Sequence, residues 1–231
     1  AGIAIVQHGE PLLVAGYGVR SVDSGEPVDA DTVFMLASNT KPLTAFTLAT
    51  LVDEGAVAWT TPASEVIPEL RLMDAYAELH ATPRDFLAHR SGLPAFTGDQ
   101  LAEFGYSVEE TLRRLRYLTP GSSFRDIAAY SNLGYTIIGE MIARLTGGTW
   151  EAAMNERLFA PLGMTRSGAS LDDLPSDDNI SAVHAMIDGE VVTVDPYVGR
   201  AIGAGGSAIT TASDMTHWLT TLLAGGAADG Q

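Results

Sequence analysis

The chain has 231 residues and no cysteine, and its 13 Lys and Arg stand against 29 Asp and Glu, a formal net charge of −16 at pH 7. This acidic balance argues against a nucleic-acid-binding protein, which needs a basic face to displace counterions, and it disfavours anionic membrane surfaces. The absence of cysteine excludes a disulfide scaffold, thiolate catalysis and zinc bound through cysteine.

The first residues predict a hairpin followed by a buried helix. Apolar runs at 2–7 and 11–19 flank His8-Gly9-Glu10 and predict two strands. A short apolar run at 32–37 precedes a strongly apolar segment from Ser38 to Glu54, which predicts a core helix that ends at Gly55. The chain opens directly on the hairpin, so no signal peptide is expected, and no apolar window is long enough for a transmembrane helix.

Helical patterns separated by loops follow. Thr82 and Pro83 predict a helix cap and first turn, and a strand is expected at 191–194. Further helices are predicted over 108–117, 133–145, 150–159 and 213–223. The stretch rich in glycine and alanine from 225 to Gln231 is expected to be a processed or flexible loop.

Lys41 is the single lysine of the chain, which contains twelve arginines. Arginine can replace lysine as a surface cation, but it cannot replace an amine that gives up its proton. Lys41 ends the pattern Ser38-Asn39-Thr40-Lys41 at the start of the predicted helix, where residues three apart share a face. The helix N-terminus and burial both disfavour a protonated amine, so Lys41 is a candidate general base for a nucleophilic Ser38. Chance predicts about 0.06 such patterns, and the competing interpretation is a surface lysine in a first turn.

A second pattern, Tyr130-Ser131-Asn132, precedes the helix predicted at 133–145. A tyrosine hydroxyl near a cation can relay a proton to a leaving group, and an asparagine amide can orient a substrate or the lysine. Taken alone, a buried tyrosine followed by an asparagine cap is the better interpretation. Together, the two patterns favour catalysis.

This pair of motifs resembles the serine β-lactamase and penicillin-binding-protein superfamily, in particular its branch of class C β-lactamases, D-alanyl-D-alanine peptidases, D-aminopeptidases and β-lactamase-like esterases. Weaker similarities occur in the same order along the chain. They are the run 31–38, His89-Arg90-Ser91-Gly92-Leu93-Pro94, Pro120-Gly121, the run 159–164 and Ala204-Gly205-Gly206.

The resemblance implies an α+β fold in which an antiparallel sheet flanked by helices accompanies an all-α region, with the substrate cleft between them. We therefore expect an α/β region made of 1–60 and 196–231, and a mainly helical region over 61–195. The family's third motif, Lys-Thr-Gly or His-x-Gly, is expected after residue 231, and the last sheet strands with it. A second polypeptide that supplies them is one expectation, and a truncated chain is another.

The resemblance also implies the roles of the site residues. Ser38 is the nucleophile, Lys41 and Tyr130 move protons, and the backbone N–H of Ser38 supplies part of the oxyanion hole. Asn132 holds the acyl side chain or Lys41, and Gly205 and Gly206 line the substrate site.

The expected function is that of a serine hydrolase that forms an acyl-enzyme on an amide or ester, with a D-amino-acid peptidase or amidase as the first choice. The alternatives are a β-lactamase-like carboxylesterase and a non-catalytic ligand-binding member or fragment. The expected partner is a small peptide, amide or ester substrate, with no metal, organic cofactor, nucleic acid or membrane span. A periplasmic or secreted location is expected from the resemblance, with a cytoplasmic one as the alternative. His89 is expected to pack a loop, because no Gly-x-Ser-x-Gly surrounds a serine that it could activate.

Overall fold

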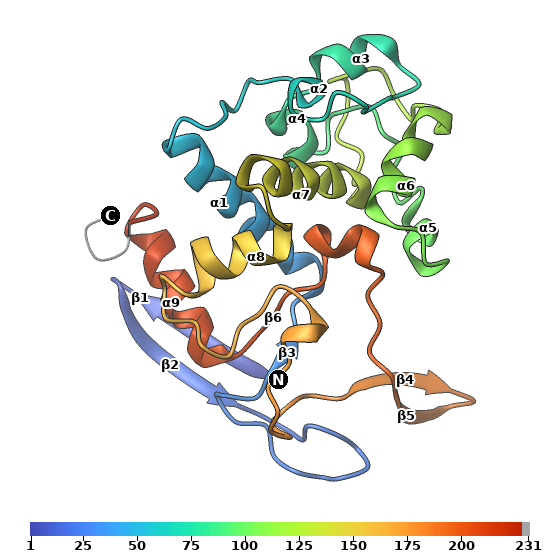
Figure 1. Ribbon diagram of the computed structural model, residues 1–231. Helices are drawn as coiled ribbons and strands as arrows, with labels where there is room; N and C mark the ends of the chain where they lie inside the picture. Colours follow the sequence, from blue (N-terminus) through green and yellow to red (C-terminus); the bar gives the residue numbers. More distant parts are fainter. Residues whose placement is uncertain (228–231) are drawn as a thin grey trace. The chain divides into compact units, whose positions relative to one another are not determined.

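The computed structural model describes residues 1–227, which form two compact units (Figure 1). The first unit contains 1–36, 159–197 and the described residues from 208 onward; the second contains 37–158 and 198–207. The division expected from the sequence placed the helix after Ser38 in the α/β region. The structure groups this helix with the helical unit instead, because it packs against the helices that follow it.

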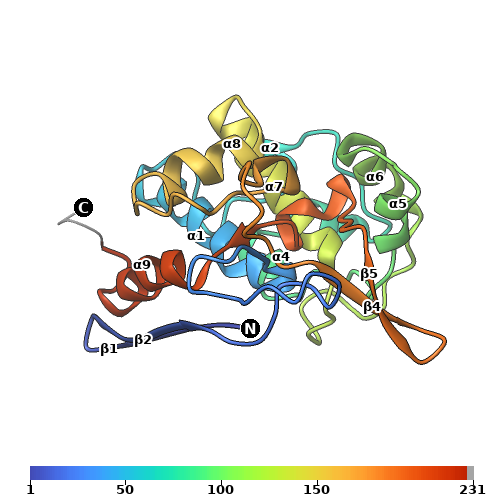
Figure 2. The same ribbon diagram turned by 90° about the horizontal axis from the view of Figure 1, so that it is seen from below.

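The predicted hairpin is present in the first unit. Strands β1 (Gly2–Gln7) and β2 (Glu10–Gly16) pair antiparallel from Gly2↔Gly16 to Gln7↔Glu10. His8 and Gly9 both have positive φ angles, as a two-residue turn between twisted strands requires. Helix α9 (Ala212–Leu223) packs on this hairpin, as Figure 2 shows from below.

Two further strand pairs complete the first unit. The short strands β3 (Phe34–Met35) and β6 (Ile209–Thr210) pair antiparallel. The strand predicted at 191–194 is β5 (Glu190–Val194), and it pairs with β4 (Val183–Ile187), which the sequence pattern did not indicate. Each sheet of the described residues therefore has two strands.

The second unit is helical. Its α-helices are α1 (Thr40–Asp53), α2 (Ala63–Val66), α3 (Ala75–His80), α4 (Pro83–Leu87), α5 (Asp99–Glu103), α6 (Val108–Arg114), α7 (Asn132–Thr146) and α8 (Trp150–Met154). Turns of 3-10 helix cover Ala37–Asn39, Leu115–Tyr117 and Arg200–Gly205, and α8 continues as π-helix over Asn155–Phe159.

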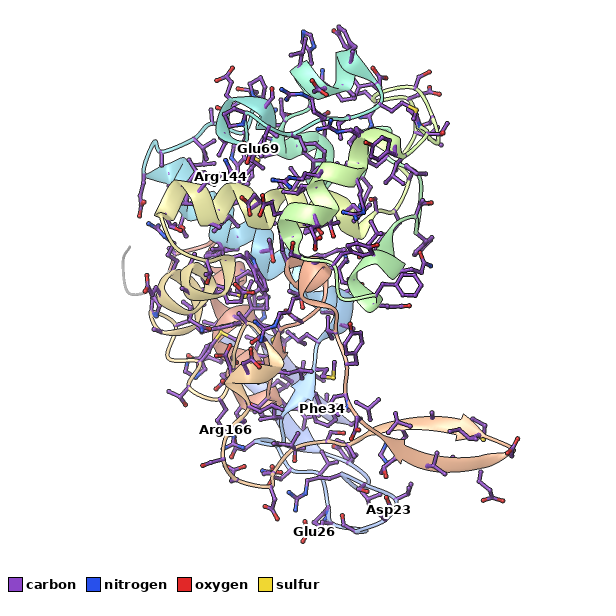
Figure 3. All side chains as sticks on the ribbon, turned by 45° about the vertical axis from the view of Figure 1, so that its right-hand side comes forward. Asp23, Glu26, Phe34, Glu69, Arg144 and Arg166 are labelled. Atoms are coloured by element: carbon purple, nitrogen blue, oxygen red, sulfur yellow. The ribbon has the colours of Figure 1, made fainter. Side chains whose placement is uncertain are left out.

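Helix α7 forms the centre of this unit and packs against α1, α4, α8 and the 3-10 turn at 200–205. Its side chains Ile137, Ile138, Met141 and Ile142 are fully buried. Burial of each such side chain contributes about 1.5–3 kcal/mol, so the first turn of α7 rests on a rigid support. At the far end of the helix, Arg144 forms an ion pair with Glu69 (Figure 3).

Helix α1 begins at Thr40, two residues after the predicted start, because Ser38 lies in the 3-10 turn that precedes it. Pro42 lies in its first turn, where a missing N–H costs nothing, and Gly55 follows the helix with a φ of +76°. Leu43, Leu48 and Leu51 are fully buried, which confirms a core helix. None of the helices within residues 1–227 is long and apolar enough to cross a membrane.

Candidate active site

Ser38 lies in the 3-10 turn that leads into α1. The residue before it, Ala37, has a φ of +46°, a conformation that non-glycine residues rarely adopt outside sites where the surrounding structure enforces it. Ser38 is exposed, so a substrate can reach its hydroxyl. The N-terminus of α1 carries partial positive charge, which stabilises negative charge developing on this oxygen.

Lys41 is buried, with 5% of its surface exposed, and its Nζ lies within hydrogen-bond distance of three oxygen atoms. Nζ donates to the side-chain Oδ1 of Asn132 and to the backbone oxygen of Gly205, both at 2.7 Å. Its third contact is with Oγ of Ser38, at 3.2 Å. The two shorter bonds hold the amine within hydrogen-bond distance of the serine hydroxyl.

Tyr130 approaches the same serine from the other side. Its hydroxyl donates to Ser38 Oγ at 2.6 Å. Burial alone would raise the pKa of the Tyr130 phenol, but hydrogen bonds with Lys41 and Ser38 and the charge of Lys41 outweigh it, so that this pKa is lowered. Ser38 Oγ is therefore held between a buried amine and an acidified phenol.

A second tyrosine near Lys41, Tyr135, makes its hydrogen bond elsewhere and has a raised pKa. The ring centroid of Tyr135 lies 5.2 Å from Nζ, against 4.8 Å for Tyr130. Its hydroxyl donates to the backbone oxygen of Leu87, and burial raises its pKa to about 12. Only one of the two phenols near the amine is thus arranged to exchange a proton with the serine.

Asn132 contacts the lysine, one of the two roles expected for it. While its Oδ1 accepts from Lys41, its Nδ2 donates to Oδ2 of Asp99 at 2.9 Å. No sequence pattern indicates Asp99, the first residue of α5, because its partner lies 33 positions further along the chain.

The two predicted glycines lie beside this group. A Cβ atom at Gly205 would lie 3.3 Å from both Lys41 Nζ and Asn132 Oδ1, so glycine allows the backbone to approach the amine. At Gly206 the nearest atoms to such a Cβ belong to the backbone of Ala37, beside the nucleophile turn. Of the two glycines, Gly205 contacts the lysine, because its carbonyl oxygen accepts a hydrogen bond from Lys41 Nζ.

His89 packs the segment that carries Tyr130, as expected of a loop-packing residue. Its ring centroid lies 4.6 Å from that of Tyr130, and its Nδ1 accepts from the backbone N–H of Ser131 at 3.2 Å. Burial, followed by the charge of Lys41, lowers the pKa of His89. The neutral imidazole is the form that accepts this bond.

An ion pair between the buried Asp85 and the half-exposed Arg125 anchors the chain just before Tyr130. Arg125 donates Nε and Nη2 to the two carboxylate oxygens of Asp85 at 2.7 and 2.8 Å. Asp85 also accepts from the backbone N–H and hydroxyl of Thr82, the predicted cap of α4. Although burial would raise the pKa of the Asp85 carboxyl, these bonds lower it overall. The loop from 122 to 130 is therefore tied to α4.

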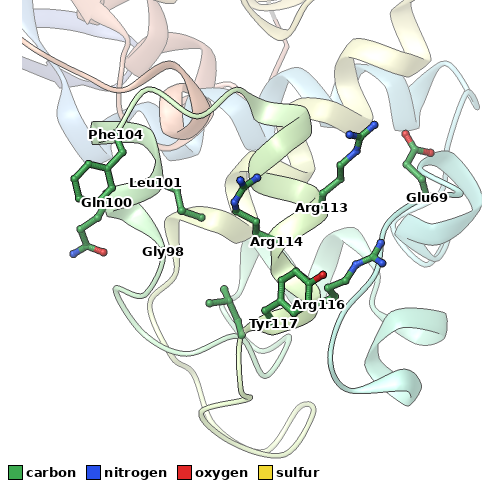
Figure 4. Close-up of a pocket in the computed structure, with 10 residues that line it drawn as sticks. Glu69, Gly98, Gln100, Leu101, Phe104, Arg113, Arg114, Arg116 and Tyr117 are labelled. Atoms are coloured by element: carbon green, nitrogen blue, oxygen red, sulfur yellow. The ribbon is translucent and has the colours of Figure 1, made fainter.

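A pocket of about 720 Å³ in the same unit lies against α5 and α6 (Figure 4). None of the six predicted site residues lines it. Two of its arginines already have partners, since Arg113 pairs with Glu109 and Arg114 stacks on the ring of Tyr106. No group of three His, Asp or Glu side chains within residues 1–227 could hold a metal ion.

The chain has the β-lactamase/transpeptidase-like fold. An octameric penicillin-binding protein homologue from Pyrococcus abyssi superposes with a TM-score of 0.81 and 24% identity over 96% of this chain and 52% of that one. FmtA from Staphylococcus aureus superposes with a TM-score of 0.82 and 18% identity over 97% of this chain and 62% of that one. At these identities the likeness establishes the fold.

The sequence establishes the family. The Beta-lactamase family model matches residues 1–231, and the chain therefore belongs to the β-lactamase family of hydrolases. It is 33% identical to esterase EstB of Burkholderia gladioli over 72% of this chain and 46% of the esterase. Penicillin-binding protein 4 of Amycolatopsis lactamdurans is 29% identical over 99% of this chain and 60% of that protein. Unguisins hydrolase ungD' of Aspergillus campestris is 28% identical over 96% of this chain and 43% of that protein. The chain spans about half the length of these relatives.

Proposed function

We propose that this chain carries the nucleophile and proton-transfer groups of a serine hydrolase that cleaves an amide or ester through an acyl-enzyme. The observation that carries the proposal is the placement of Ser38 Oγ between Lys41 Nζ, at 3.2 Å, and the Tyr130 hydroxyl, at 2.6 Å. Both distances lie within the reach of direct proton transfer.

In the first half-reaction, Ser38 Oγ attacks the substrate carbonyl carbon while Lys41, as the free amine, takes the serine proton. The carbonyl oxygen becomes an oxyanion that accepts from the backbone N–H of Ser38. Collapse breaks the bond to the leaving group, which receives a proton from Tyr130, and Lys41 returns a proton to the phenolate. The products are an ester on Ser38 and the free amine or alcohol.

In the second half-reaction, a water molecule attacks the ester carbonyl. Tyr130 and Lys41 together accept its proton, and the Ser38 oxygen leaves with a proton as the carboxylic acid is released. Every proton transfer in this cycle, including those to the leaving group and from water, involves Ser38, Lys41 or Tyr130, so the scheme uses no metal or organic cofactor.

For the substrate, we propose first an amide or peptide of a D-amino acid. The likeness to a penicillin-binding protein and to a hydrolase named for unguisins supports this choice. The alternative is a carboxylesterase, which the 33% identity to esterase EstB supports. The direct contact of Tyr130 with Ser38 further favours the class C-like branch.

The deciding experiment is an intact-mass spectrum of the purified protein before and after a fluorophosphonate probe, with peptide mapping of any adduct. We expect one adduct, on Ser38, which is absent in Ser38→Ala and retained in a matched control, Ser122→Ala. An unlabelled wild-type protein, or an adduct on another serine, would contradict the proposal and favour a ligand-binding protein. The same spectrum tests whether a second polypeptide accompanies the chain.

Matched substrates separate the two chemistries. We expect the D-alanine p-nitroanilide to be hydrolysed with a higher kcat/KM than the L-isomer. A p-nitrophenyl ester that is hydrolysed while both anilides are inert would assign the esterase alternative.

A further inference from the structure

We propose that Asp99 is a positioning residue for this site: it fixes the Asn132 amide so that its oxygen, and not its nitrogen, faces Lys41. The inference rests on the proposed function, since it concerns the orientation of the lysine as base. Three contacts in series connect Asp99 to the nucleophile. They are Asp99 Oδ2 with Asn132 Nδ2 at 2.9 Å, Asn132 Oδ1 with Lys41 Nζ at 2.7 Å, and Nζ with Ser38 Oγ at 3.2 Å.

The chemistry of the three groups leaves one orientation of the amide. A carboxylate group only accepts hydrogen bonds, and the Nζ–H groups of Lys41 only donate them. If the Asn132 amide were reversed, its NH₂ would face the Lys41 donors and its oxygen would face the Asp99 carboxylate. Both bonds would then be lost at once, and two pairs of like groups would oppose each other. An apolar residue at position 99, which offers no acceptor to Asn132 Nδ2, would remove this preference.

The backbone brings Asp99 to this place. Gly98, directly before it, has a φ of +86°, and a Cβ atom there would lie 2.7 Å from Leu133 in the first turn of α7. The N–H of Phe96 donates to the backbone oxygen of Tyr130 at 2.9 Å, and the two rings stack at 5.2 Å. The loop 96–99 is thus fixed to the segment that carries Tyr130 and Asn132.

The carboxylate of Asp99 has a second effect, which is electrostatic. Its Oδ1 is buried and has no hydrogen-bond partner within residues 1–227, so no second donor shares its charge. The charged and titratable groups around the Tyr130 phenol are Lys41, His89 and Asp99, together with the neutral Tyr135. Lys41 lowers the pKa of Tyr130, whereas the negative charge of Asp99 raises it and partly opposes this effect.

Two substitutions at position 99 distinguish the effect of the Asn132 amide orientation from the effect of the Asp99 charge. Asp99→Ala removes both the acceptor and the charge, so the Asn132 amide can turn away and Lys41 loses its alignment. We expect kcat to fall about 10–10²-fold, as misplacement of a catalytic group by about 1 Å does, with KM changed less than threefold. Asp99→Asn keeps an oxygen that can accept from Asn132 and removes only the charge. We expect it to keep kcat within about tenfold of the wild type and to lower the pKa of Tyr130 further.

The matched control is Asp126→Asn, which removes the same charge from an exposed residue four positions before Tyr130. We expect its kcat and its Tyr130 titration to equal those of the wild type. The phenol is titrated by ultraviolet difference between each protein and its Tyr130→Phe counterpart. The high pKa of Tyr135 keeps that residue out of the lower transition.

The outcomes separate the two proposals. If the wild type forms no acyl-enzyme, the proposed function fails, while the titration still tests Asp99, because it requires no turnover. A Tyr130 titration in Asp99→Asn that matches Asp126→Asn would overturn the inference. An Asp99→Ala variant whose kcat equals that of the Asp126→Asn control would also overturn the inference. If Asp99→Ala does not fold, the isosteric Asp99→Asn titration decides alone.

Discussion

Replacement of Tyr130 by phenylalanine removes one oxygen from the site and little else. The ring packs between His89, 4.6 Å away, and Phe96, 5.2 Å away, and both contacts survive in Tyr130→Phe. The variant loses the 2.6 Å bond to Ser38 Oγ, at a cost in stability of about 0.5–1.5 kcal/mol. A general acid contributes about 10²–10⁴-fold to the rate, so we expect kcat/KM to fall by that factor.

The loss should depend on the leaving group. An amide nitrogen cannot leave without a proton, whereas p-nitrophenolate is stable as an anion and needs none. If Tyr130 is the acid, the variant should lose more activity on a D-alanine anilide than on the matching p-nitrophenyl ester. Steady-state kcat/KM for both substrates measures this difference.

The matched control is Tyr135→Phe. The Tyr135 ring lies about as close to Lys41, yet its hydroxyl bonds to the backbone oxygen of Leu87 and does not contact Ser38. We expect this variant to keep kcat/KM within a few-fold while losing about 0.5–1.5 kcal/mol of stability. A Tyr130→Phe enzyme within tenfold of the wild type on the anilide, or equal losses for both tyrosines, would refute the assignment of Tyr130 as the acid.

Three further predictions concern the supports of the site. Asp85→Asn should destabilise the fold by about 1–3 kcal/mol in urea unfolding at neutral pH, because Asp85 is buried while its partner Arg125 is half exposed; unchanged stability would contradict the anchoring role. His89 has a pKa below that of the unfolded chain, so its contribution to stability is complete above about pH 6.5 and is lost as the pH falls through the lowered folded-state value. Between about pH 7.5 and pH 5 the wild type should therefore lose more unfolding free energy than His89→Gln, and parallel curves would exclude this role. Lys41→Arg should reduce acylation of Ser38 by about 10²–10⁴-fold, because the positive charge remains but the base is lost; a fast-labelling variant would show that charge alone suffices.

Local signals in the sequence were sufficient for much of the scaffold. The apolar run after Ser38 and the glycine at 55 predicted α1 to within two residues at its start and one at its end, and the turn at His8-Gly9 predicted the hairpin. These features depend on residues close together in the chain. The pairing of β3 with β6 joins two-residue strands about 175 positions apart, and such short segments carry no periodicity to read.

The site residues that the sequence indicates are likewise close together in the chain, whereas Asp99 is distant from its partner Asn132. Ser38 and Lys41 are three residues apart, and Tyr130 and Asn132 are two apart, so spacing alone indicated each pair. Asp99 is identified only through its partner, because it begins the short helix α5, whose position depends on the left-handed conformation of Gly98 and its approach to α7. A sequence pattern cannot encode a contact that such a residue makes across the fold.

Lys41 shows most clearly how composition and structure combine. A chain that uses arginine at twelve positions and lysine at one indicates that this amine does something a guanidinium cannot. Composition does not say what holds the amine in place. The structure provides two acceptors, a side-chain oxygen from Asn132 and a backbone carbonyl from Gly205, and the second is invisible to any motif because every residue has one. Glycine at 205 matters because a Cβ atom there would lie 3.3 Å from the amine. Gly205 thus positions Lys41 through its backbone carbonyl oxygen, and the lack of a side chain at this residue leaves room for the amine.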